Sequence, residues 1–119
     1  FTMGKSWDSH CPLSPAIVVD EGLDPHALHL QTWVNGDLRQ DTLTNDLIFN
    51  CYELIEFLST AFTLESGDVI LTGTPSGVGM AQKPPAMLKP GDVVKVAIEG
   101  LGHIENTVTE EPPEKAQFI

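Results

Sequence analysis

Apolar and polar side chains alternate loosely over residues 28–34. Alternation is typical of a strand with one buried face. Asn35-Gly36 follows directly, and residues 37–42 continue beyond it. Asn-Gly accepts the two positive φ angles of a type I′ turn, so this region predicts a β-hairpin.

The next segment changes to a helical period. Between residues 46 and 62, apolar side chains recur every three or four positions, the spacing of one helix face. Residues 44–46, Thr-Asn-Asp, offer side chains that can cap a first turn. We expect an amphipathic helix over about 46–62, with Glu53 and Glu56 near its solvent side.

Further apolar runs predict further strands. The β-branched run at 15–19, between prolines and an acidic turn, predicts a buried strand. Residues 93–99 and 103–109, separated by a glycine-bearing turn, predict a second hairpin. With one helix among these strands, the expected fold class is α+β and mostly β.

Two segments repeat one short pattern. Leu64-Glu-Ser-Gly67-Asp68 is echoed by Leu88-Lys-Pro-Gly91-Asp92, and apolar residues follow each copy. Two copies are too few for a solenoid. We interpret each copy as a tight turn that feeds a strand, in which Asp68 and Asp92 hold the turn geometry rather than a metal ion.

Length and charge exclude several classes of protein. The chain has 119 residues, enough for one domain, and its 17 acidic and 6 basic residues give a net charge of −11. This charge argues against nucleic-acid binding and against a polybasic membrane anchor. No apolar run approaches the ~20 residues of a spanning helix. Cys11 and Cys51 are too few for a disulfide scaffold, and we expect reduced thiols in an intracellular protein.

Lys5 is the first candidate for chemistry. Apolar Met3, Trp7 and Leu13 are its neighbours in the sequence. A partly desolvated lysine stabilises a substrate oxyanion or acts as a base. The alternative is a surface lysine that keeps its ammonium group in water.

A glycine-rich loop is the second candidate. Residues 69–79 carry an apolar run straight into Thr72-Gly73-Thr74-Pro75-Ser76-Gly77-Val78-Gly79. Such a loop presents backbone N–H groups, together with the Thr74 hydroxyl, to an anion such as a carboxylate. It lacks the lysine of a phosphate loop. The alternative is a wide turn between two strands.

Other reactive side chains do not form a known pattern. His26 and His29 are three residues apart, but His10 and Cys11 do not complete a convincing zinc set. Ser76 lacks the spacing of a nucleophile elbow. A zinc site and serine nucleophile chemistry are therefore not expected.

Several motifs occur in a fixed order over residues 1–109. They are Phe1-Thr2-Met3-Gly4-Lys5-Ser6, Cys11-Pro12-Leu13-Ser14-Pro15, Trp33-Val34-Asn35-Gly36 with Arg39-Gln40, Gly67 to Gly79, Lys83-Pro84-Pro85 and Leu88 to Asp92. In this order they closely resemble the C-terminal half of the fumarylacetoacetate hydrolase family. The Ile70-Leu-Thr-Gly-Thr-Pro-Ser-Gly-Val-Gly79 run is the most specific part of the resemblance.

The resemblance implies a fold, a chemistry and roles for three residues. The fold is a mixed β-roll or β-sandwich with short helices, and the protein is a homodimer. The chemistry is cleavage, decarboxylation or isomerisation of small 2-oxo and β-diketo acids, with Mg²⁺ or Mn²⁺ stabilising an enolate. Lys5 is then the catalytic lysine, Thr74 binds the substrate carboxylate, and Gly73 allows close backbone approach.

One part of the family pattern is missing from this chain. In the family, a Glu-x-Glu pair and an Asp bind the metal, and a His–Glu pair activates water in the hydrolases; all lie upstream of the Gly-Lys-Ser motif. The chain also begins abruptly at Phe1, which is not an initiator Met. We expect residues 1–110 to be the C-terminal part of a catalytic domain, residues 111–119 a polar tail, and the metal ligands to lie outside this chain.

The resemblance implies an enzyme in the complete protein. The expected function is a metal-dependent hydrolase or lyase acting on C–C bonds, of the acylpyruvate hydrolase or oxaloacetate decarboxylase type. The alternatives are a 2-hydroxyhepta-2,4-diene-1,7-dioate isomerase activity, or a non-catalytic carboxylate-binding or dimerisation module. The expected partners are a small oxo acid and a second copy of the protein, in the cytoplasm or in the mitochondrial matrix of a eukaryote.

Overall fold

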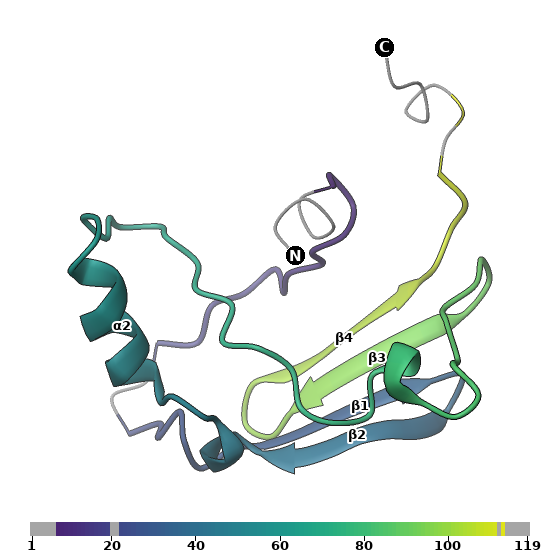
Figure 1. The fold of residues 1–119 in the computed structure, drawn as a ribbon, viewed down its shortest axis with the longest axis horizontal. Helices are drawn as coiled ribbons and strands as arrows, with labels where there is room; N and C mark the ends of the chain where they lie inside the picture. Colours follow the sequence, from purple (N-terminus) through teal and green to yellow (C-terminus); the bar gives the residue numbers. More distant parts are fainter. Residues whose placement is uncertain (1–6, 20–21, 112, 114–119) are drawn as a thin grey trace.

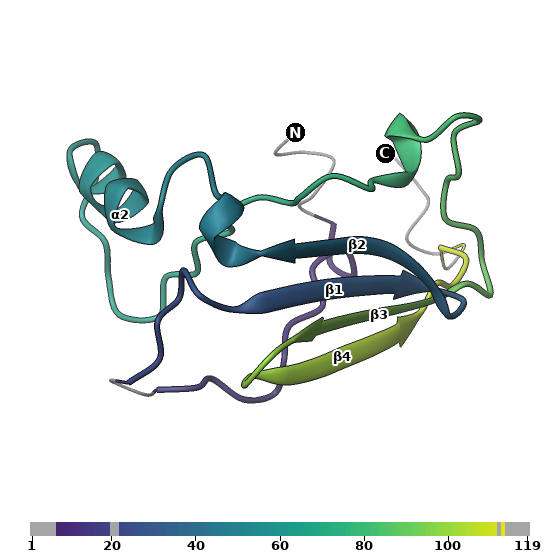
Figure 2. The same cartoon turned by 90° about the horizontal axis from the view of Figure 1, so that it is seen from below.

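Four antiparallel strands form one open sheet. The computed structural model describes residues 7–19, 22–111 and 113. The strands are β1 (His29–Val34), β2 (Asp37–Leu43), β3 (Val93–Ile98) and β4 (Gly102–Thr107), in the spatial order β2-β1-β3-β4 (Figure 2). The expected α+β, mostly β fold class is confirmed.

Both predicted hairpins are present. Asn35 and Gly36 connect β1 to β2 with φ angles of 53° and 85°, the positive values that a type I′ turn needs. Strands β3 and β4 are paired from Val93↔Thr107 to Ile98↔Gly102. The observed ends lie within one or two residues of the predicted ends.

The two faces of the sheet differ in character. Side chains alternate along a strand, so Thr32 of β1 shares a face with Val96, its partner in β3. Thr32 is 8% exposed and is the most buried of the described residues. On the opposite face, the Lys95 ammonium lies 5.7 Å from the centroid of the Trp33 ring. The Thr32 face is therefore the packed one.

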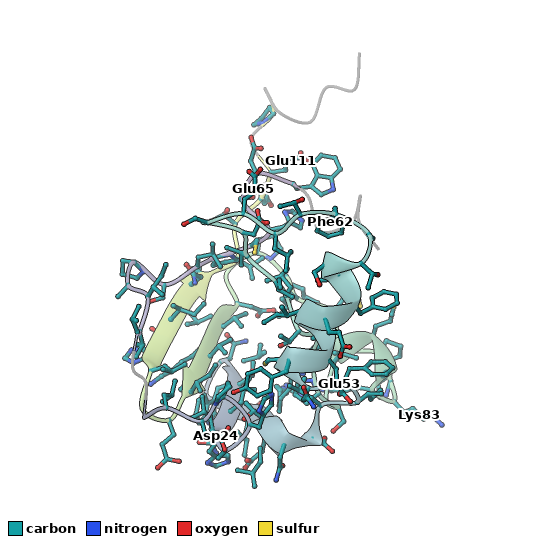
Figure 3. All side chains as sticks on the ribbon, turned by 90° about the vertical axis from the view of Figure 1, so that its left-hand side faces the viewer. Asp24, Glu53, Phe62, Glu65, Lys83 and Glu111 are labelled. Atoms are coloured by element: carbon teal, nitrogen blue, oxygen red, sulfur yellow. The ribbon has the colours of Figure 1, made fainter. Side chains whose placement is uncertain are left out.

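Helix α2 (Cys51–Ser59) lies at one end of the sheet and is shorter than predicted (Figure 1). Asn50, not residues 44–46, caps it: the Asn50 side chain accepts from the Glu53 amide, and the Glu53 carboxylate accepts from the Asn50 amide. This reciprocal capping box satisfies two backbone donors and fixes the start of the helix. Residues 44–46 form instead the 3₁₀ turn η1 (Thr44–Asp46). Figure 3 shows Glu53 near one end of the helix and Phe62 just past the other.

Two predicted strands are wrong. Residues 15–19 and residues 69–71 belong to no strand. Ile17 and Val19 are 90% and 91% exposed, and Leu71 is 66% exposed. β-Branched residues favour extended backbone, but a strand also needs a partner for its hydrogen bonds, and neither segment pairs with another part of the described chain.

The repeated turns are confirmed, although only one of them feeds a strand. In the first copy the Asp68 carboxylate accepts from the Glu65 amide at 2.8 Å, and in the second the Asp92 carboxylate accepts from the Lys89 amide at 2.8 Å. Each aspartate thus bonds to the backbone three residues before it. The second turn leads into β3, whereas the first leads into the extended segment that carries the glycine-rich loop.

The connection between α2 and β3 brings that loop back along the sheet (Figure 1). It includes the 3₁₀ turn η2 (Gly79–Ala81). No helix in the described ranges is long and apolar enough to cross a membrane. Cys11 and Cys51 are both free thiols, and Cys11 is exposed.

Candidate functional site

A pocket of about 640 Å³ lies between the packed face of the sheet and the connection from α2 to β3. The hairpin supplies one wall and the glycine-rich loop with the residues after it supplies the other. The lining residues are Thr32, Val34, Asn35, Arg39, Gln40, Thr74, Gly77, Val78, Gly79, Met80, Gln82, Pro85, Ala86, Met87, Leu88, Lys89, Asp92 and Val94.

Thr74 is held at the wall of this pocket by a side chain from β2. The Gln40 Nε2 group donates to Thr74 Oγ1 at 2.9 Å and to the Pro75 carbonyl at 3.0 Å. Gly73, just before Thr74, has a φ of 112°, and a Cβ built on it would meet open space. The structure therefore brings Thr74 to the pocket and leaves open space beside Gly73.

Two later glycines serve close packing. A Cβ on Gly77 would lie 2.0 Å from the Arg39 carbonyl oxygen, and a Cβ on Gly79 would lie 2.0 Å from the Ala86 carbonyl oxygen. Only a residue without a side chain fits at these distances. Arg39 is the extra residue of a β-bulge, because Thr32 pairs with Gln40 while Trp33 pairs with Leu38. The backbone of the glycine-rich loop therefore packs directly against the β-bulge at Arg39.

The Gln82 side-chain amide links the segment after the glycine-rich loop to Arg39 and to Gly77. Arg39 Nη1 donates to Gln82 Oε1 at 3.1 Å, and Gln82 Nε2 donates to the Gly77 carbonyl at 3.3 Å. Arg39 also lies 3.4 Å from the Asp37 carboxylate. Arg39 therefore links the bulge to the loop, and it adds a positive charge to the pocket wall together with Lys89.

Asp92 is a structural carboxylate at the edge of the pocket, as the sequence pattern predicted. Asn35 Nδ2 donates to Asp92 Oδ1 at 2.8 Å, and the Lys89 amide donates to Asp92 Oδ2. The hydrogen bond from Asn35, followed by that from the Lys89 amide, lowers the pKa of Asp92 from its ordinary value of 3.8.

His26 and His29 are not among the residues that line the pocket. His29 Nε2 is bonded to the Asp41 carboxylate on the polar face of the sheet, and this hydrogen bond lowers the pKa of Asp41. His26 Nε2 accepts a hydrogen bond from the Cys51 amide at 2.9 Å. It thereby satisfies an N–H group in the first turn of α2 that has no acceptor within the helix. Both histidines therefore have structural partners.

The described residues contain no group of three or more His, Cys, Asp or Glu side chains that could hold a metal ion. The donor set of residues 7–19, 22–111 and 113 therefore does not fit a divalent ion, which needs several oxygen ligands. Lys5, the expected catalytic residue, lies outside the described residues, as does most of the expected 111–119 tail.

Sequence reasoning missed Gln40 as a residue of the site. Gln40 entered only as part of the Arg39-Gln40 motif, and nothing in that pattern states what its amide contacts. The register of the hairpin could have identified Gln40, because Gln40 pairs with Thr32 and lies on the same packed face of the sheet. A polar residue on a packed face needs a partner, and Thr74 and Pro75 provide it.

Comparisons with known proteins agree with the motifs. Residues 1–109 match the family model of the fumarylacetoacetate (FAA) hydrolase C-terminal domain. The mitochondrial oxaloacetate tautomerase fahd2 of Xenopus laevis is 50% identical over 107 residues, which are 89% of this chain and 34% of that protein. The chain thus spans about a third of the length of this curated relative.

Solved structures show the same architecture. A fumarylacetoacetate hydrolase of Exiguobacterium antarcticum matches with a TM-score of 0.87 and 45% identity, over 92% of this chain and 39% of that one. The maleylpyruvate hydrolase of Sphingobium sp. SYK-6, solved with manganese (II) and pyruvate, matches with a TM-score of 0.77 and 36% identity, over 87% and 37%. The chain belongs to the fumarylacetoacetate hydrolase family, in the part that forms the C-terminal domain.

Proposed function

We propose that the complete protein is an enzyme acting on small 2-oxo acids, and that this chain supplies the site for the substrate carboxylate. The observation that carries the proposal is the place of Thr74. Thr74 lines a pocket and follows a glycine with open space beside it, and the Gln40 side chain of β2 donates a hydrogen bond to its hydroxyl. Backbone amides and a hydroxyl in such a loop are suited to an anion.

The charges around the pocket support an anionic substrate. Two basic residues, Arg39 and Lys89, line the pocket against one acidic residue, Asp92, whose carboxylate is hydrogen-bonded to Asn35 and to the Lys89 amide. The chain as a whole carries a net charge of −11, so this local excess of positive charge matters for attracting an acid. Asp92 is accordingly proposed to shape the turn and not to contact substrate.

The proposed reaction passes through an enolate. Lys5, from the Gly-Lys-Ser motif, is proposed to stabilise the negative charge that develops on the enolate oxygen. A divalent ion, Mg²⁺ or Mn²⁺, would polarise the oxo acid when bound. The described residues lack a donor set for it, so we propose that its carboxylate ligands lie outside this chain.

Two reactions of 2-oxo acids share that enolate. Cleavage or decarboxylation at a C–C bond is the function expected from the motifs, and a relative named for hydrolysis of maleylpyruvate supports it. The second candidate is tautomerisation of oxaloacetate, which a 50% identical relative named as an oxaloacetate tautomerase supports. Tautomerisation moves a proton between carbon and oxygen and breaks no C–C bond.

The test is an assay of the complete protein with Mg²⁺ or Mn²⁺ on oxaloacetate and on acylpyruvates. Thr74→Val should raise KM for the active substrate by about tenfold, since a hydrogen bond to a charged group is lost. Thr74→Ser keeps a hydroxyl and is the matched control, with KM close to that of the wild type. An unchanged KM in Thr74→Val would refute the proposed role of this site.

We also propose that the complete protein is a homodimer, in the cytoplasm or in a mitochondrial matrix. Ile48 and Phe57 are 91% and 73% exposed, and a subunit interface is one way to cover such side chains. The mass of the complete protein in solution, measured by light scattering, tests this proposal. The mass of a single copy would contradict it.

A further inference from the structure

Gln40 makes both of its amide N–H bonds to the glycine-rich loop. Nε2 donates to Thr74 Oγ1 at 2.9 Å and to the Pro75 carbonyl at 3.0 Å. The backbone of Gln40 is held in β2 opposite Thr32, the most buried of the described residues. The donor group is therefore carried by a paired strand and not by a loop.

The orientation of this amide is dictated by Pro75. A carbonyl oxygen only accepts hydrogen bonds, so the group that faces it must be the NH₂ end of Gln40 and not its oxygen. The same NH₂ end then donates to Thr74 Oγ1. Because the hydroxyl accepts from Gln40, its single proton is left for another partner. Thr74 lines the pocket, where such a partner would be a ligand.

From this geometry we infer that Gln40 is a positioning residue that sets the Thr74 hydroxyl as a donor toward a substrate carboxylate. The inference rests on the proposed role of Thr74. An ionised carboxylate only accepts hydrogen bonds, so it matches a hydroxyl whose proton is available. A glutamate at position 40 would reverse the polarity, since its carboxylate would take the hydroxyl proton and face the Pro75 carbonyl oxygen.

Binding of oxalate in the presence of Mn²⁺, measured by calorimetry on the complete protein, tests the inference. Thr74→Val and Gln40→Met should each weaken oxalate binding by about tenfold, the effect of one hydrogen bond to a charged group. The double variant should bind oxalate no more weakly than Thr74→Val alone, because Gln40 acts through the hydroxyl. Gln40→Glu, which has nearly the volume of the natural side chain, should weaken binding more than Gln40→Met at neutral pH.

Gln82→Met is the matched control for loosening of the loop. Gln82 also ties the loop through its amide, but its partner is the Gly77 carbonyl and not Thr74. Any loss of oxalate binding that it causes should therefore add to the loss from Thr74→Val. In turnover, Gln40→Met should raise KM for the 2-oxo acid while its kcat changes less.

The outcomes separate the two claims. Unchanged oxalate binding in Thr74→Val would overturn the proposed carboxylate site itself. A loss in Thr74→Val together with wild-type binding in both Gln40 variants would overturn only the positioning role. Full additivity of Gln40→Met and Thr74→Val would overturn it as well, because Gln40 would then act independently of the hydroxyl.

Discussion

The Asn35 side chain, in the turn of the first hairpin, binds Asp92, the residue just before β3. Asn35 Nδ2 donates to Asp92 Oδ1 at 2.8 Å, and Asn35 Oδ1 accepts from the Val93 amide at 2.9 Å. The backbone adds a third link, from the Asn35 amide to the Val93 carbonyl. Asn35 and Asp92 both line the pocket, so these bonds fix one end of it.

Replacing Asn35 with glycine should destabilise the protein. Gly accepts the φ of 53° at this position, so Asn35→Gly removes the side-chain hydrogen bonds without straining the turn. Loss of the bond to the Val93 amide should lower the free energy of unfolding by about 1 kcal/mol. Denaturant unfolding measures this, and Asn35→Ala, which adds strain at positive φ, should be less stable still. An Asn35→Gly variant as stable as the wild type would show that the hydrogen bonds of the Asn35 side chain contribute nothing to the free energy of unfolding.

Acid should remove the contribution of Asp92 to stability. The pKa of Asp92 lies below its ordinary value of 3.8, because Asn35 and the Lys89 amide bond to the ionised carboxylate. Because its pKa is lower in the folded state, ionised Asp92 stabilises the fold at pH values above its pKa in the unfolded state. This stabilisation is lost as the pH falls through the pKa of Asp92 in the folded state. The wild type should therefore lose more stability than Asp92→Asn between about pH 6 and about pH 2. Equal losses, in denaturant titrations across this range, would contradict the prediction.

Local chemistry explains which parts of the fold were predictable. Asn35-Gly36 specifies its turn within two residues, and the Gly-Asp turns specify theirs within four, so both were found. The strand predictions at 15–19 and 69–71 failed because an apolar extended run does not determine its pairing. The helix start was misplaced because several capping residues compete, and the Asn50–Glu53 pair satisfies more donors than residues 44–46 do.

The candidate site was predictable only in part. Thr74 is a candidate from the sequence because a glycine-rich loop after an apolar run is a local signal for an anion site, and the structure places Thr74 in the lining of the pocket. Gln40 was missed because its role depends on a contact with Thr74, 34 positions away, that no local pattern encodes. The sequence marks Gly77 only as one residue of the glycine-rich loop, whereas its close approach to the Arg39 carbonyl depends on the strand bulge.

Adding one methyl group to Gly77 should disrupt the pocket. The new Cβ would lie 2.0 Å from the Arg39 carbonyl oxygen, at a φ of 104°, so backbone must move on both sides. We expect Gly77→Ala to cost about 3 kcal/mol or more of stability, combining overpacking with strain at positive φ. Gly67→Ala is the matched control: it has a φ of 100° and open space around the new Cβ, so it should cost only about 1–2 kcal/mol. Similar losses for the two variants, in thermal unfolding, would refute the close-packing role of Gly77.

Removal of the Lys5 ammonium should slow turnover by the complete protein. If Lys5 stabilises the enolate oxygen, its interaction strengthens as charge develops, so Lys5→Ala should lower kcat by about a hundredfold or more. Lys83→Ala is the control for losing one positive charge, since Lys83 is exposed and points away from the molecule (Figure 3). Its kcat should match that of the wild type. Both variants need unfolding curves like that of the wild type, because lost stability also lowers apparent activity. A kcat within twofold of the wild type in a folded Lys5→Ala protein would remove Lys5 from the mechanism and leave Thr74 as a binding residue without this catalytic partner.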